Sequence, residues 1–487
     1  MSRLKQLGKD SIIYGVGGVM GKGISFFLLP VYTRIFPPAD YGAIEMLTVL
    51  TALLSAVLGL GMDSAQSMFF FKEKGAGVAC QAKVVSSILQ WRLMWGWVVI
   101  LIVTLLAPVL NASFFSDKLD WTYFAVAFVG ALATQVMGQS IEVLRLLYRP
   151  WPYVAIMVAQ NLAAAAATLG LVLVFRQGIF GYFLGATLAS ILAACVGWWL
   201  VRPYLNFSEV HWRRWPMLLH FGAPLLLSDL AFYLMNTTDR WFVREYCGEA
   251  ELGVYALGAK MAMLVALAVE TFRKAWWPIA MDAMHSQDGP ESYRMIARLF
   301  SGVATSGVVM LTLMSPWLVE WFAAPAYRSA WPIVGILAWP SVFYGFYLVA
   351  SAGIWKSEKT YLSAVLMVSS AMLNIVLNYV FVPKFGTIGA ALATAITYFL
   401  WVAVAMVLSE MLWKIGFPLR IMCLHLTVAL LTGYWLIAMR GGDFDVITTV
   451  VAVMISAVLF ATAIDRSARI ALLHGIGRFL TRGGGVN

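Results

Sequence analysis

The chain of 487 residues contains few charged side chains. Only 12% of its residues are Asp, Glu, Lys or Arg, whereas 61% are hydrophobic, and the mean hydropathy is +0.82. A soluble core cannot bury so much apolar surface, so this composition excludes an ordinary soluble protein and predicts an integral membrane protein. The formal net charge is +10, but no basic run or nucleic-acid-binding motif is present, so we expect no nucleic-acid partner.

Residues that build metal centres, disulfides and catalytic sites are also scarce. The four cysteines have no CxxC spacing, the five histidines form no catalytic or metal-binding pattern, and the GxxxxGK[ST] motif of direct ATP hydrolysis is absent. The residues concerned are Cys80, Cys195, Cys247, Cys423, His211, His220, His285, His425 and His474. We therefore expect no metal and no cofactor. Because the expected outer loops are all shorter than about 15 residues, a membrane polymerase or ligase is a poor interpretation.

Long apolar segments make up most of the chain, and each is long enough to cross a bilayer as a helix. We expect fourteen spans, at about 11–35, 41–71, 84–110, 120–147, 152–175, 179–201, 217–243, 250–282, 296–322, 330–355, 360–382, 386–411, 419–439 and 444–464. The first has no convincing signal-cleavage site and is expected to remain as a helix. The predicted fold is an all-α integral membrane protein with six-helix lobes at 1–205 and 206–412, followed by two extra helices and a tail at 413–487.

The two predicted lobes contain related segments. Tyr32–Met46 parallels Thr238–Met261, which begins 206 residues later, and Tyr153–Gly181 parallels Tyr361–Gly389, which begins 208 residues later. Two separate matches at nearly the same offset indicate an internal duplication. Both copies start from the same side of the membrane, so the repeat is parallel and its axis runs along the membrane normal. A substrate is expected to lie between the two halves.

Basic residues predict the orientation of the chain. With fourteen spans, about 21 Lys and Arg residues fall on the side of the N-terminus and about seven on the opposite side. The seven are Arg34, Lys118, Arg176, Arg244, Arg328, Lys384 and Arg440. Positive charge marks the cytoplasmic side, so both termini are expected in the cytoplasm and the protein in the cell (inner or plasma) membrane.

Ionisable side chains within or beside the spans are the candidate functional residues, because such groups normally face a bundle interior or a watery cavity. The cations are Lys22, Arg34, Arg240, Lys260 and Arg273, and the carboxylates are Asp63, Asp229, Asp239 and Glu270. Structural roles compete with this interpretation: Arg34 and Arg240 lie near helix ends, where long side chains reach the interface. Glu270 and Arg273 are three residues apart and can neutralise each other, and Asp239 can pair with Arg240.

Lys22 is the cation hardest to explain structurally. It lies near the middle of the first span between Gly21 and Gly23, where a ligand or a neighbouring backbone can approach closely. Adding the repeat offset places its equivalent beside Asp229. We predict that Lys22 and Asp229 face each other across the pseudo-twofold axis and separate when an anionic substrate enters.

Several phrases, in order along residues 8–410, carry a family resemblance. They are LPVYTRIFPPADYGAIE, GLGMDSAQSMFF, TDRWF followed by ELGVYALGAKMAMLV, AWWP, and NIVLNYVFVPKFGTIGAALATAITY. The chain resembles the polysaccharide-export, Wzx-like branch of the multidrug/oligosaccharidyl-lipid/polysaccharide (MOP) superfamily, whose fold the MATE transporters share. The resemblance implies a flippase that moves undecaprenyl-diphosphate-linked oligosaccharide outward for O-antigen, capsule or exopolysaccharide assembly. It also implies two lobes that open alternately around a cationic cavity. Membrane lipid, a polysaccharide polymerase and chain-length or export proteins are the further partners.

This substrate agrees with the candidate residues. A lipid diphosphate is anionic, so the five cations can bind its head group. The four carboxylates are candidates for coupling or gating, and an H⁺ or Na⁺ gradient or the membrane potential is the expected energy source. Amides and aromatic side chains that either bind the sugars or join helices are Gln135, Gln139, Gln160, Asn161, Tyr233, Asn236, Tyr344, Tyr347, Asn374 and Asn378.

Two rival transport functions remain. A multidrug cation antiporter shares the superfamily fold, but its site would need acidic helices, and this chain has at least as many basic groups in the spans. A lipid II flippase would handle nearly the same head group, and the sequence does not separate it from the oligosaccharide flippase.

Overall fold

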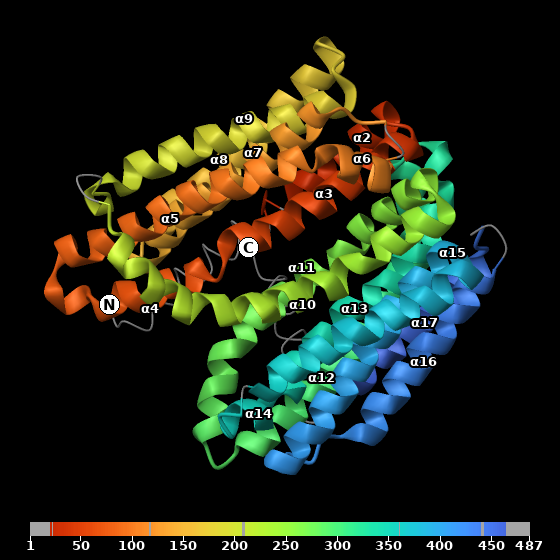
Figure 1. Cartoon of the computed structure of the whole chain (residues 1–487). Helices are drawn as coiled ribbons and strands as arrows, with labels where there is room; N and C mark the ends of the chain where they lie inside the picture. The colour runs from red at the N-terminus through yellow and green to blue at the C-terminus, as the bar shows by residue number, and fades with distance from the viewer. Residues whose placement is uncertain are drawn as a thin grey trace, which may run out of the picture. The chain divides into compact units, whose positions relative to one another are not determined.

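The computed structural model describes residues 20–21, 23–115, 118–206, 210–359, 361–439 and 443–463. Within these ranges the regular structure is entirely helical (Figure 1). The helices of the first part are α2 (Leu29–Ile35), α3 (Pro38–Gly59), α4 (Met62–Lys72), α5 (Val78–Leu105), α6 (Ala107–Phe115), α7 (Trp121–Leu146), α8 (Pro150–Leu169) and α9 (Gly178–Val201). Those that follow are α10 (Trp215–Cys247), α11 (Glu249–His285), α12 (Gly289–Phe322), α13 (Trp331–Ala350), α14 (Ala352–Lys356), α15 (Tyr361–Leu412), α16 (Leu419–Ala438) and α17 (Val446–Ala463).

The helices confirm the all-α membrane fold. In the described part of the chain, eleven helical segments are long and apolar enough to cross a membrane. The 52-residue α15 contains a non-helical residue, Gly386, with φ 59° and ψ −138°, and therefore consists of two helices. Dividing α15 there and adding the charged α10 and the short apolar helix Gly23–Ile35 gives fourteen, in agreement with the expected number.

Two of the expected spans contain breaks that periodicity did not reveal. The span expected at 41–71 is divided into α3 and α4 at Leu60 and Gly61, which both have left-handed backbone, with φ of 43° and 66°. The span expected at 84–110 begins earlier, at Val78, and ends at Leu105. A separate helix, α6, follows it. The left-handed residues Leu60 and Gly61 interrupt the helical hydrogen-bond pattern without changing the run of apolar side chains, so hydropathy alone does not detect this break.

The chain packs as two compact units. The first contains the described residues up to Leu257 together with 322–327 and 367–393, and the second contains 258–321, 328–366 and the described residues from 394 onward. The lobe boundaries expected from the repeat, after residues 205 and 412, follow sequence symmetry and not packing, and they stay a prediction.

Within the first unit, α9 packs against both α7 and α8, and α7 also contacts α3 and α5. Helix α10 contacts α3, α4 and α5, so it belongs with the N-terminal helices by packing (Figure 1). These contacts bring charged residues of α10 against α3 and α4, where the main candidate site lies.

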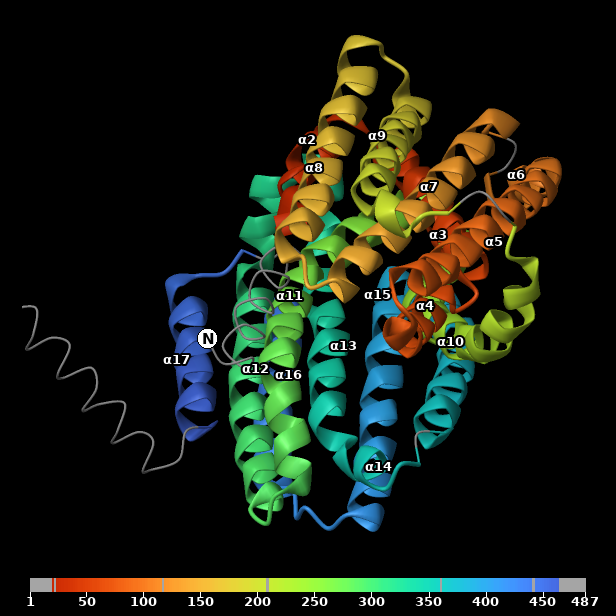
Figure 2. The same ribbon diagram turned by 90° about the vertical axis from the view of Figure 1, so that its left-hand side faces the viewer.

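Within the second unit, the last two helices dock on α12, and Figure 2 shows α17 beside it. A Cβ on Gly302 of α12 would lie 2.4 Å from Ala463 Cβ and 2.5 Å from Leu459 O on α17. His425 of α16 is 1% exposed and connects Ser301 Oγ of α12 (2.8 Å) with Thr462 Oγ1 of α17 (2.9 Å). A buried imidazole bonded at both nitrogens holds the α16–α17 pair in place.

Candidate functional site

Four side chains from three helices form a buried acid–base cluster in the first unit: Glu45 of α3, Asp239 and Arg240 of α10, and Tyr255 of α11. The Arg240 Nε lies 3.3 Å from Glu45 Oε1, and Arg240 Nη1 lies 2.9 Å from Asp239 Oδ1. The Tyr255 hydroxyl donates to Asp239 Oδ2, and the Arg240 guanidinium lies 5.8 Å from the centre of the Tyr255 ring. The cluster therefore joins helices that are far apart in sequence.

The cluster is well shielded from solvent. The side chains of Asp239, Glu45 and Arg240 are 1%, 8% and 16% exposed. Arg240 Nη1 also donates to Asn236 O at 2.6 Å. Separating a buried charge from its partners leaves that charge uncompensated and costs about 3–5 kcal/mol. A change that pulls α3 from α10 breaks the Glu45–Arg240 contact, whereas Arg240 keeps Asp239, its neighbour on α10.

Two glycines let α3 and α11 approach beside this cluster. A Cβ on Gly42 would lie 2.0 Å from Glu249 O, and a Cβ on Gly253 would lie 1.9 Å from Pro38 O. Contacts this short leave no room for any side chain at either position. Gly42 and Gly253 stand in the segments Tyr32–Met46 and Thr238–Met261, which the sequence predicts to be copies of one repeat. The contact thus joins the two predicted copies.

A second charged group lies nearer the start of α10. It consists of Asp63 of α4, Arg92 of α5 and Asp229 of α10. Arg92 Nη2 lies 2.6 Å from Asp63 Oδ1, and Arg92 Nη1 donates to Gln135 O at 2.5 Å. The Arg92 side chain is 1% exposed, whereas that of Asp63 is 57% exposed. Asp229 is also exposed and lies close enough to Asp63 for the two charges to interact. Exposed carboxylates this far along spanning helices are expected to face a watery space.

The break between α3 and α4 explains why α10 comes so close to Asp63. A Cβ on Gly61 would lie 2.1 Å from Gly222 O, and a Cβ on Gly222 would lie 2.7 Å from Leu60 O. Gly61 therefore serves both the left-handed turn and the backbone contact. Helix α10 follows α3 and α4 from the Gly222 contact to the Arg240 contact.

In the second unit, α11 carries a local charge group. Arg273 is bonded to Glu270 through Nε at 2.9 Å and Nη2 at 2.6 Å, and Lys274 Nζ lies 3.7 Å from the same carboxylate. Glu270 and Arg273 thus pair with each other, which agrees with the structural role considered for them in the sequence. The Arg273 side chain remains 43% exposed, so it can still reach a ligand.

The other predicted cations are placed as follows. Arg34 is exposed at the end of α2 and donates to Pro30 O at 3.1 Å, and Lys260 is half-buried on α11 in the second unit. Lys22 lies outside the described residues, so its predicted pairing with Asp229 stays a prediction. Of the nine predicted residues, the structure joins Asp239 with Arg240 and Glu270 with Arg273, and brings Asp63 near Asp229.

Three of the amides and hydroxyls considered for sugar binding form hydrogen bonds that connect helices. Gln135 donates to Ser55 O at 2.9 Å and Gln139 to Val85 O at 2.9 Å. Tyr233 of α10 donates to Val49 O of α3 at 2.6 Å. These bonds agree with the structural interpretation of the polar side chains in the spans.

Sequence reasoning missed three members of these groups. Glu45 stands in the quoted segment DYGAIEM and Tyr255 in ELGVYAL, and Arg92 is visible in the sequence only as a basic residue within a span. Glu45 could have been found from its charge alone, because it lies within an expected span. The partnership of Arg92 with Asp63 depends on how α4 and α5 pack. In the described part of the chain, no three His, Cys, Asp or Glu side chains are placed to hold a metal ion.

Comparisons with protein families place the chain among membrane proteins of polysaccharide assembly. The model of the family described as polysaccharide biosynthesis protein matches residues 7–284, and the MatE model matches residues 224–380. "Lsg locus putative protein 1" of Haemophilus influenzae is 23% identical over 281 residues, or 57% of this chain and 66% of that protein. The "Putative O-antigen transporter" of Shigella flexneri is 19% identical over 44% of this chain and 51% of its own length. The alignments thus span less than two thirds of these relatives.

A solved structure shows the same fold. The lipid II flippase MurJ in an inward closed conformation superposes with a TM-score of 0.72, covering 93% of this chain and 98% of its own, at 15% identity. At this identity the likeness concerns the fold alone.

Proposed function

Because the chain belongs to the polysaccharide biosynthesis protein family, we propose that it is a flippase that moves undecaprenyl-diphosphate-linked oligosaccharide from the inner to the outer leaflet by alternating access. The observation that carries this proposal is the family match over residues 7–284, which covers the acid–base cluster and the repeat contact at Gly42 and Gly253. The product would feed O-antigen, capsule or exopolysaccharide assembly, with a polymerase and chain-length or export proteins as partners. The protein is a transporter and not an enzyme in this proposal.

The acid–base cluster supplies a means of coupling substrate to lobe movement. If 1–205 and 206–412 move as lobes, opening the end that carries Gly42 and Gly253 separates Glu45 from Arg240. The diphosphate head group carries anionic oxygens that can take the place of Glu45 at Arg240, since guanidinium pairs well with phosphate. Substrate binding thus compensates for the lost Glu45 contact. Lys22, Arg34, Lys260 and Arg273 are the other cations proposed for the head group.

The energy source is proposed to act through carboxylates. Asp63 and Asp229 are exposed and close enough to interact, so binding of H⁺ or Na⁺ between them relieves their repulsion. Asp239 and Glu270 are each tied to an arginine and serve gating in this proposal. The distribution of Lys and Arg supports cytoplasmic termini.

A MATE-like cation antiporter is the second candidate, because the MatE model matches residues 224–380 and the exposed Asp63 and Asp229 can bind an organic cation. A lipid II flippase is the third, supported by the shared fold. In cells that lack the gene, the oligosaccharide flippase predicts lipid-linked repeat units that accumulate and stay inaccessible to a periplasmic probe. Accumulated lipid II, or drug sensitivity without any glycan defect, would instead support one of the other two candidates.

A further inference from the structure

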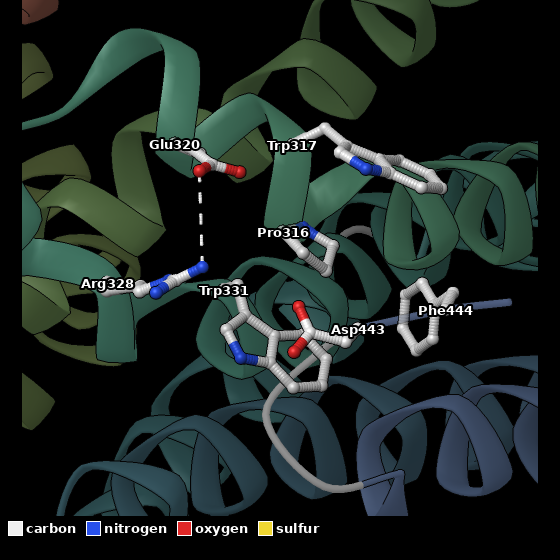
Figure 3. Close-up of a pocket in the computed structure, with 7 residues that line it drawn as sticks. All are labelled: Pro316, Trp317, Glu320, Arg328, Trp331, Asp443 and Phe444. Carbon is white, nitrogen blue, oxygen red and sulfur yellow. Dashed lines mark ion pairs between the residues drawn. The ribbon is translucent and has the colours of Figure 1, made fainter.

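A hollow of about 150 Å³ lies in the second unit at the end of α12 (Figure 3). Its walls come from three separate segments: the last turns of α12, the start of α13 with the turn before it, and residues 443–444 before α17. In the predicted topology this end of α12 is on the outer side of the membrane. It takes no part in the charge groups described above.

Three aromatic rings form one wall. The Phe444 ring stands edge-to-face against Trp317, with centroids 6.1 Å apart at 78°, and against Trp331, at 6.0 Å and 89°. Trp331 is 7% exposed, so its ring is fixed by its surroundings. Because Phe444 contacts both tryptophans, the wall has a definite shape and presents apolar ring surface to a ligand.

Charged groups of both signs form the rest of the rim. Arg328 Nη2 lies 4.0 Å from Glu320 Oε1, and these side chains are 67% and 58% exposed. Figure 3 shows this pair on one side of the hollow and Trp317 with Phe444 on the other. Asp443 is exposed and also lines the hollow. An ion pair that is so exposed and so widely separated is weak, so the Glu320 carboxylate and the Arg328 guanidinium remain available to a ligand.

We propose that this hollow is a saccharide-binding subsite on the exit side of the protein. A simple ion does not suit it, because carboxylates and a guanidinium stand together on the rim. Hydroxyl groups both donate and accept hydrogen bonds, so they satisfy Glu320, Asp443 and Arg328 alike. A hollow of about 150 Å³ has the volume of a cavity that admits benzene, so it can take one sugar ring whose hydroxyl groups lie at the exposed rim. The C–H face of a pyranose is the apolar surface that matches the aromatic wall.

This inference rests on the proposed function, because that function brings a saccharide to this face of the protein. It gives the same substrate a second binding contact. A sugar unit held at the exit would keep the translocated oligosaccharide from returning inward. Binding of the free sugar can be measured without transport, so the two proposals can fail separately.

The test uses the full chain in nanodiscs of phosphatidylcholine and phosphatidylglycerol. The probe is the soluble oligosaccharide that mild acid releases from the host strain's lipid diphosphate carrier, and binding is titrated by saturation-transfer difference NMR. Trp317→Leu is expected to weaken binding about three- to tenfold, because one aromatic contact is lost. Asp443→Asn is expected to weaken binding as well. The matched control is Trp321→Leu, which removes a 69% exposed tryptophan of the same helix outside the hollow and should bind like the wild type.

Three results would overturn the inference: no saccharide signal from the wild type, unchanged affinity in both hollow variants, or equal loss in the Trp321→Leu control. Phosphatidylethanolamine that co-purifies with the wild type but not with Asp443→Asn, without saccharide binding, would assign the hollow to a zwitterionic lipid head group. If the protein binds the saccharide but does not flip lipid-linked oligosaccharide, the proposed function is contradicted and the subsite is supported.

Discussion

The Arg240 guanidinium lies 3.3 Å from the Glu45 carboxylate, although the two residues are 195 positions apart in the chain. One stands in the first copy of the predicted repeat and the other at the start of the second. This shielded salt bridge is held only while α3 and α10 stay together. The proposed cycle requires this bond to break and an anionic substrate to replace it.

Arg240→Ala is expected to lower the free energy of unfolding by about 3–5 kcal/mol, because Glu45 and Asp239 stay buried without their counter-ion. Thermal unfolding followed by size-exclusion chromatography in detergent measures the loss. The matched control is the triple variant Glu45→Gln, Asp239→Asn and Arg240→Met, which removes the charges together and should recover most of the stability. A single variant as stable as the wild type would show that the cluster contributes little.

Gly253→Ala is expected to destabilise the protein by about 1–3 kcal/mol, because the new Cβ would lie 1.9 Å from Pro38 O and must push α11 from α3. The same thermal assay applies. Gly138→Ala on α7 is the control, since nothing lies within 4 Å of its added Cβ, and it should equal or slightly exceed the wild type. Equal stability of both variants would contradict the close backbone contact.

The variants Asp63→Asn and Asp229→Asn are expected to differ in stability but to show the same change in transport. The Asp63→Asn change would leave Arg92, at 1% exposure, without its negative partner, so this variant should unfold at a lower temperature. Asp229 is exposed, and its Asn variant should unfold like the wild type. In both variants, transport in proteoliposomes should lose its response to an imposed H⁺ or Na⁺ gradient. Full gradient response in either one would remove that carboxylate from the proposed coupling pair.

His425→Leu is expected to lower stability by about 1–3 kcal/mol, because Ser301 and Thr462 each lose a buried hydrogen-bond partner. We assign α16 and α17 no transport role, so the rate per folded molecule should not change. His285→Leu, at an exposed histidine, should match the wild type in both measurements. A lower rate per folded His425→Leu molecule would give the last two helices a part in transport.

The fold could be predicted from the sequence because hydropathy and the positions of Lys and Arg both report on the bilayer. Even the division of α15 was expected, since the apolar run over 361–412 is too long for one span. The break at Leu60 and Gly61 could not be predicted in the same way. Its apolar composition matches that of a continuous helix, and only the approach of Gly222 shows why the backbone turns.

The candidate site was predictable in its residue types and not in its partners. Arg240 and Asp239 stood out because charges in spans are expensive, and their adjacency already predicted a pair. Glu45 belongs with them only through the packing of α3 against α10, which no local pattern encodes. Asp63 was identified as a coupling candidate, whereas the buried arginine that holds it comes from α5 and became visible only in three dimensions.

The central claim is tested most directly by the transbilayer movement of an undecaprenyl-diphosphate oligosaccharide in proteoliposomes under imposed ion gradients. The wild type is compared with Arg240→Ala and with the triple variant of Glu45, Asp239 and Arg240. We predict that the wild type flips this substrate and that both variants do not. The loss is predicted even for the triple variant, which is expected to keep most of its stability. Absence of wild-type flipping, together with gradient-driven efflux of organic cations, would contradict the flippase and identify a cation antiporter.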